Sequence, residues 1–259
     1  MLNLHIGIPG LFPRMLHLAT VGMLNKEQPY LLPEKQYQEK FRSVINSKRK
    51  ESEVDFNLRL EAQLAAVELS ERGTLAISQH AMLGSMEDCF RKDKVLPYSE
   101  VRVSEVSRVF ASVPITFHLT ITNQFDYLRA AMERKGKGTT FSEESSVPSW
   151  ASLVQRIKAA APNRQIVVWD FERPERIALA FAISMLDTTD ETLIEELHRR
   201  LSRSFKKKGS LMTSHEIPSM DHELNTRLDA QYDADLVAIK LMEGVSLVES
   251  ESVPDEFHL

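Results

Sequence analysis

LNLHIGIPGLFPR, residues 2–14, contains a strand pattern, a loop and the start of a helix in one short stretch. Apolar residues at positions 2, 4, 6 and 8 alternate with period two, which is typical of a β-strand. The pattern stops at Pro9 and Gly10, which favour a loop. Pro13 suits the first turn of a helix, because the N–H that proline lacks has no helical partner there. The chain is therefore expected to begin with a strand, a loop and a helix.

Four further β-prone segments follow, and helical sequence separates each from the next. Strands are expected at 74–78, 113–121, 165–169 and 244–248, and helices at 14–24, 34–72, 99–110, from 123, and at 150–161, 173–186, 190–208 and 220–242. Strands separated by helices of this length pair in parallel, with helices on both faces. The predicted fold is α/β: a three-layer α/β/α domain over residues 1–259, with a mainly parallel central sheet of about four or five strands. The helical segment 34–72 lies between the first two strands, and Phe56, Leu60, Leu64 and Val67 share one face of it.

Composition and charge exclude several classes of partner. The net charge of −5 leaves no excess of lysine and arginine for a nucleic acid backbone. Cys89 is the single cysteine, so an internal disulfide is impossible and a reducing compartment is favoured. The first residues lack a basic leader pattern, and no apolar run approaches the roughly 20 residues that cross a bilayer. The expectation is a cytoplasmic protein with neither nucleic acid nor membrane as partner.

Several segments are similar to bacterial P-loop sulfotransferase-like proteins. LHIGIP at 4–9 resembles the first strand of that family, in which Lys-Thr-Gly-Thr-Thr usually follows. Similar segments are ISQHAMLG at 77–84, ITFHLTITNQFDYLRAA at 115–131, and the stretches 150–172 and 232–248. The resemblance covers most of the chain. It implies a P-loop fold and, as cofactor, 3′-phosphoadenosine-5′-phosphosulfate, the donor from which the family transfers sulfuryl groups.

The loop after the first strand departs from the family pattern. A phosphate cradle needs small residues, a helix N-terminus and a lysine. Here Leu11 and Phe12 crowd the loop, Pro13 donates no N–H, and no lysine is present. The candidate cofactor contacts that remain in this region are Gly7, Pro9, Gly10 and Arg14, of which Arg14 carries the charge.

The second phosphate-binding element also departs from the pattern. The family usually has an arginine at the end of the third strand and a serine about eight residues later, where this chain has Thr122 and Ala130. Arg129 lies one residue away, but one helical residue is about 100° of rotation. Asn123, at the start of the next helix, is a further candidate contact.

FKKKG at 205–209 resembles the basic loop that closes over the nucleotide in some sulfotransferases, which makes Lys208 and Gly209 candidate cofactor contacts. The same residues suit an ordinary helix end, where cations offset the dipole and glycine stops the helix.

His80 is the candidate catalytic residue, because it follows a predicted strand end where a general base could deprotonate a hydroxyl acceptor. A structural role for His80 is the alternative. His5 and His118 lie within predicted strands and are expected to be satisfied core histidines. No metal site is expected, since HExxH spacing is absent. The acidic segment 249–256 is expected to be a solvated end.

Three functions stay open. The first is a sulfotransferase-family protein with a degenerate phosphosulfate-nucleotide site, weakly active or inactive, that serves as a binding or regulatory relative. The two lost charged contacts are commonly worth ~1.5–3 kcal/mol each. The second is an active sulfotransferase with a hydroxyl acceptor, either a small molecule or a glycan. The third is a helical module at 34–72 that binds a protein partner and no ligand.

Overall fold

The computed structural model describes residues 1–7, 30–32, 37–42, 53–71, 73–78, 82–83, 90–91, 94–128, 149–209 and 222–259. Its centre is one sheet in the order β2-β3-β1-β6-β7-β8, and every neighbouring pair is parallel. The strands are β1 Leu2–His5, β2 Tyr30–Leu31, β3 Leu75–Ser78, β6 Ile115–Ile121, β7 Gln165–Asp170 and β8 Val245–Val248. A separate antiparallel pair joins β4 Phe90–Arg91 to β5 Lys94–Val95. The predicted parallel α/β fold is confirmed; its assignment to the P-loop sulfotransferases stays a prediction.

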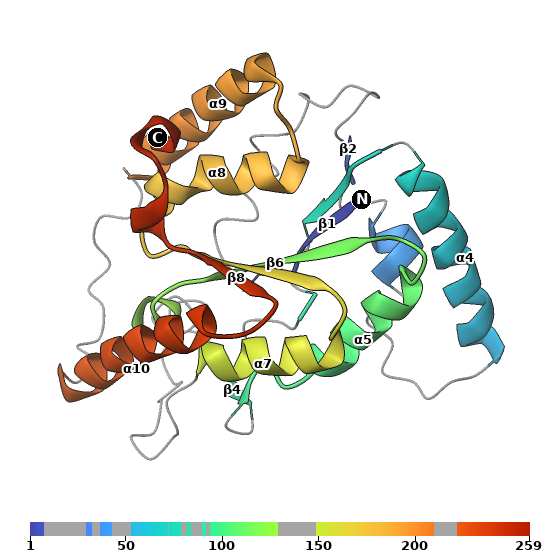
Figure 1. Cartoon of the computed structure of the whole chain (residues 1–259), viewed down its shortest axis with the longest axis horizontal. Coiled ribbons are helices and arrows are strands. Elements are labelled where there is room, and N and C mark those ends of the chain that lie inside the picture. The colour runs from blue at the N-terminus through green and yellow to red at the C-terminus, as the bar shows by residue number, and fades with distance from the viewer. Residues whose placement is uncertain are drawn as a thin grey trace.

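Helices cover both faces of the sheet and complete the three layers. They are η1 Gln38–Arg42, α4 Glu53–Ser70, α5 Ser99–Val109, α7 Trp150–Ala160, α8 Pro174–Leu186, α9 Glu191–Gly209, α10 His222–Lys240, η3 Ser250–Ser252 and η4 Asp255–Phe257. In Figure 1, α8 and α9 lie above the sheet, while α5, α7 and α10 lie below it. The helix α4 lies at the outer end of the molecule, beside α5.

The alternation of side chains along the central strands builds two cores. Residues such as Leu4 and Phe117 point to the α5 and α7 side, where they join the larger apolar cluster. Trp169, from β7, points the other way and packs with Phe181 of α8 in the second cluster. Because both faces of β6 are covered, all seven of its residues are buried.

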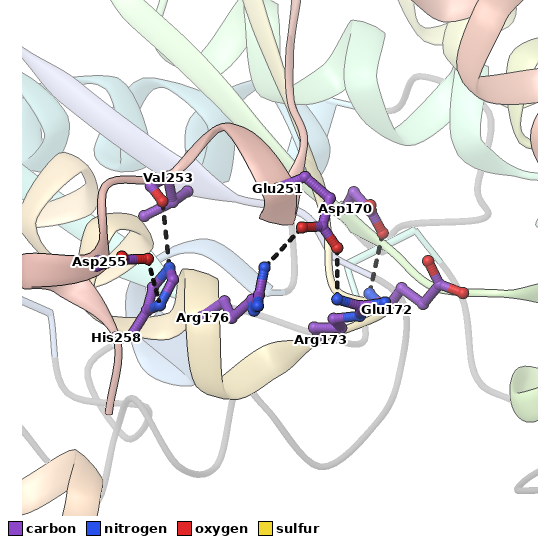
Figure 2. Close-up of polar contacts among 8 residues, drawn as sticks. All are labelled: Asp170, Glu172, Arg173, Arg176, Glu251, Val253, Asp255 and His258. Atoms are coloured by element: carbon purple, nitrogen blue, oxygen red, sulfur yellow. Dashed lines mark hydrogen bonds and ion pairs between the residues drawn. The ribbon is translucent and has the colours of Figure 1, made fainter.

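The C-terminal segment 249–256 is solvated through its acidic side chains, as expected, but it also docks on the protein. Glu251, Asp255 and Glu256 are exposed, whereas Ser250 and Val253 are buried. The carboxylate of Glu251 bridges Arg173 and Arg176 at the start of α8, at 2.6 Å from each guanidinium, as Figure 2 shows. Leu259 N also donates to the Glu175 carbonyl. No local pattern predicts this docking, because the ion-pair partners are more than 70 residues apart in the chain.

The helix α4 turns its larger apolar side chains outward. Ala62 and Ala66 are buried, whereas Leu60, Leu64 and Val67 are 44%, 63% and 37% exposed. The shared face that the sequence predicts exists, but it is not the face that packs on the core.

None of the helices within the described ranges is both long and apolar enough to span a bilayer.

Candidate functional site

The strand order places the candidate site at the carboxyl ends of β1 and β6. From β1 the chain proceeds to β2 and β3, which lie on one side of β1, whereas β6 pairs with β1 on the other side. Ligands of doubly wound sheets bind where the order reverses in this way. The N-terminal ends of α8 and α10 and the C-terminal end of α9 point to the same edge of the sheet (Figure 1).

A chain of hydroxyl and imidazole groups crosses three strands at this edge. Nδ1 of His5 lies 2.9 Å from Oγ of Ser78, and Nε2 of His5 lies 3.2 Å from Oγ1 of Thr120. The parallel register places His5 opposite Ser78 on β3. The imidazole is fully buried and packs edge-on against Phe181. Both ring nitrogens therefore have partners, as expected for a core histidine.

Gly7 lies directly over this chain of groups. A Cβ at residue 7 would be 2.1 Å from Nε2 of His5 and 2.3 Å from Oγ1 of Thr120, which is far inside van der Waals contact. Close packing alone therefore requires glycine here, without a phosphate. The proposed cofactor contact at Gly7 stays a prediction.

His118 differs from the expectation of a fully satisfied histidine. Its Nδ1 accepts a hydrogen bond from Trp169 Nε1 at 3.1 Å. The ring proton must therefore be on Nε2, and that atom has no hydrogen-bond partner in the described part of the chain. Burial lowers the pKa of His118 from 6.5 to about 4. The imidazole is consequently neutral near pH 7.

Asn123 is engaged by the protein itself. Its Oδ1 accepts from the Phe125 backbone N–H at 2.8 Å, and its Nδ2 donates to Oδ1 of Asp229 at 2.9 Å. The neighbouring Thr122 carbonyl accepts from Trp150 Nε1 at 2.8 Å. The side chain thus caps the turn after β6 and ties that turn to α10. The structure brings Asn123 to the predicted edge, and its contact with a nucleotide remains untested.

A buried carboxylate on α10 organises the nearby helix start. Asp235 is 1% exposed. It accepts hydrogen bonds from Gln124 Nε2, Ser149 Oγ and Trp150 N, each at 2.7 Å, and from Gln231 Nε2 at 2.9 Å. The network joins α10 to the first turn of α7 and to the end of β6. Asp235 could not be recognised from the sequence, because no local pattern distinguishes it from the exposed acids of the same helix.

Carboxylates dominate the end of β7. Asp170 accepts from the Tyr232 hydroxyl and, at 2.9 Å, from the Glu172 backbone N–H. The pKa of Glu172 is raised, first by partial burial and then by the charge of Asp170. Asp233 and Asp126 act in the same direction, and among the described residues Arg173 opposes them. Arg173 itself is paired with Glu251 (Figure 2). The electrostatic environment of Glu172 is therefore unfavourable to further negative charge.

The pKa of Tyr232 is also raised, chiefly by burial and next by the charge of Asp170. The hydroxyl therefore keeps its proton and serves as a donor to that carboxylate.

The remaining predicted residues fall in two groups. Lys208 and Gly209 are in the last turn of α9, at the same edge of the sheet (Figure 1). His80, Pro9, Gly10 and Arg14 lie outside the described residues. In the described ranges, no group of three or more histidine, cysteine, aspartate or glutamate side chains is arranged to hold a metal ion.

Comparisons of the chain with protein-family models, with curated proteins and with solved structures find no match. The fold and the edge described above define a doubly wound α/β protein in which the described polar groups at the carboxyl edge largely satisfy one another. The likeness to sulfotransferases rests on the sequence segments alone.

Proposed function

We propose that this chain is a sulfotransferase-like protein that binds the phosphosulfate nucleotide poorly and serves as a binding or regulatory protein rather than an efficient transferase. The observation that carries the proposal is the set of carboxylates around Glu172, at the carboxyl edge where a nucleotide would have to bind.

The donor carries several negative charges, so its site must supply cations or free N–H groups. Around Glu172 the charges of Asp170 and Asp233 act against any added anion. The opposing cation, Arg173, already has a carboxylate partner at 2.6 Å. Recruiting Arg173 to a phosphate would exchange this exposed ion pair for another one.

The groups nearer to β1 and β6 support the same conclusion. His5 is hydrogen-bonded through both ring nitrogens, and Asn123 uses both its amide nitrogen and its oxygen. A ligand that took over these contacts would replace existing hydrogen bonds rather than add new ones.

Calorimetric titration with 3′-phosphoadenosine-5′-phosphate at low salt tests the proposal. We expect no binding tighter than about 1 mM, because the loss of two charge-assisted contacts weakens binding by roughly two to four decades. The double substitution Glu172→Gln/Asp233→Asn should strengthen binding by removing repulsion. The control Glu191→Gln/Glu243→Gln makes the same change in net charge at the opposite end of the sheet and should leave affinity unchanged.

Micromolar binding by the native chain would contradict the proposal. If Arg14→Ala then abolished that binding, the active sulfotransferase would be the correct alternative. A second titration, after lysine and glycine are restored between Pro9 and Arg14, asks whether a pocket persists. Recovered affinity would support a site that has decayed, whereas an unchanged weak response would count against the sulfotransferase ancestry.

A further inference from the structure

The outer face of α10 carries an exposed apolar stripe. Val237 and Leu241, the residue directly after the helix, are 62% and 81% exposed. Ala230 and Ala234 are exposed as well. The spacings of four, three and four residues place the four side chains on one face, as at the a and d positions of a coiled coil. The stripe therefore extends over about three helical turns.

The buried face of α10 fixes the direction of the stripe. The residues of α10 that pack inward are Leu228, Tyr232, Asp235 and Ile239. Asp235 and Ile239 each lie two residues from Val237, and two helical residues are about 200° of rotation. Ala230 has the same relation to the other two buried residues. The stripe consequently points away from the sheet, on the outside of the layer that α10 forms with α7 (Figure 1).

The order of small and large residues makes the stripe complementary to a second copy of itself. The two alanines come first in the chain, and the two larger side chains follow. An antiparallel copy therefore places Val237 against Ala234 of the second copy, and Leu241 against Ala230 of the second copy. A large side chain meets a small one in each layer, which lets the two helices pack closely. A parallel copy would instead place alanine against alanine and leave that end of the contact poorly filled.

The charges beside the stripe suit the same antiparallel pairing. It brings Asp233 next to Lys240 of the second copy, and it brings Arg227 next to the turn that contains Glu243 of the second copy. Arg227 and Glu243 are exposed, and neither has an ion-pair partner within the described part of the chain. Lys240 contacts Glu249 at 2.7 Å, and its ammonium group has further N–H donors for a second carboxylate. The two-fold axis makes each of these contacts occur twice.

We propose that this chain forms an antiparallel homodimer through the outer faces of two α10 helices. A contact between a single pair of helices lies at the low end of interface sizes, below roughly 1,200 Å². The dimer is therefore weak and depends on concentration, with a dissociation constant of about 10–100 μM. The stripe is separate from the polar groups of the carboxyl edge, so the proposal holds whether or not a nucleotide binds there.

Sedimentation velocity of the full chain between about 2 and 200 μM tests the proposal. We expect the weight-average sedimentation coefficient to rise from the monomer value toward the dimer value over this range. Val237→Gln/Leu241→Gln should weaken the dimer by about tenfold or more, because the apolar contacts are lost. The matched control Leu64→Gln/Val101→Gln makes the same change in two exposed residues of α4 and α5 and should keep the native affinity.

A charge exchange distinguishes the antiparallel pairing from other arrangements. Arg227→Glu places two carboxylates opposite each other at both ends of the contact and should weaken the dimer by about fivefold or more. Arg227 and Glu243 lie at opposite ends of α10 in one chain, so they can meet only between two chains. Arg227→Glu/Glu243→Arg should therefore return the affinity to within about threefold of the native value. Circular dichroism confirms that each variant is folded.

A native chain that stays monomeric over the whole concentration range would overturn the proposal, because a second copy would then not cover the stripe. A dimer that Val237→Gln/Leu241→Gln leaves intact, or that the control weakens equally, would also overturn it, since the contact would lie elsewhere. A dimer that needs the stripe but is not restored by the charge exchange would refute the antiparallel pairing.

Discussion

Replacing Asp235 by alanine removes a buried acceptor that four donors share. Two of these donors, Gln124 Nε2 and the Trp150 backbone N–H, are themselves buried. Leaving a buried donor unsatisfied costs about 1–3 kcal/mol, and hydrogen bonds to a charged acceptor are the stronger kind. We therefore expect Asp235→Ala to lower the free energy of unfolding by about 3–5 kcal/mol, a large share of the total for an ordinary domain.

Urea unfolding followed by tryptophan fluorescence measures this loss, since Trp150 lies in the affected helix turn. The matched control is Asp233→Ala, two residues earlier on the same helix, where the side chain is exposed. We expect the control to change stability by less than about 0.5 kcal/mol. A loss of under about 1 kcal/mol for Asp235→Ala would refute the reasoning, because it would mean that the buried donors find other partners.

Gly7→Ala should destabilise the fold by about 1–3 kcal/mol, because the added Cβ overlaps His5 and Thr120. Thermal unfolding measures this loss, and an unchanged melting temperature would contradict the close packing at this edge. The pKa of His118 is about 4 in the folded chain and 6.5 ordinarily, so protonation destabilises the folded state. The contribution of the neutral ring to the free energy of unfolding is complete above pH 6.5 and is lost as the pH falls toward 4. Between pH 7.5 and pH 5 the free energy of unfolding should therefore fall by about 2 kcal/mol more for the native chain than for His118→Asn. The asparagine oxygen can still accept from Trp169. Equal losses for the two proteins in urea unfolding would show that His118 is not the cause.

The longer elements of the fold could be predicted closely. The segments 113–121 and 165–169 correspond to β6 Ile115–Ile121 and β7 Gln165–Asp170, and the helix at 150–161 to α7 Trp150–Ala160. These elements have strong local signals: a run of branched and aromatic residues for the strands, and apolar periodicity for the helix. The Ser149 hydroxyl, which accepts from Ser152 N, also marks the helix start.

The short elements could not be predicted in this way. β2 is two residues long and pairs with β3. The β4 and β5 pair lies between the strand expected at 74–78 and the helix expected at 99–110. A two-residue strand is too short to show a period, so only its partner defines it. The candidate site was predictable to the same extent. Asn123 and Gly7 could be placed near the edge of the sheet, but their hydrogen-bond partners and close neighbours come from distant parts of the chain.

The order of residues along the chain was sufficient to determine the α/β class, the parallel pairing and the position of the carboxyl edge of the sheet, because these depend on local periodicity and on the alternation of strands with helices. Tertiary packing alone selected the alanine face of α4 for burial and left Leu64 outside. It also gave Glu251 its two arginines and Asp235 its four donors. A periodic pattern shows which side chains share a face, but burial of that face depends on contacts between residues far apart in the chain, and these form only in the folded protein.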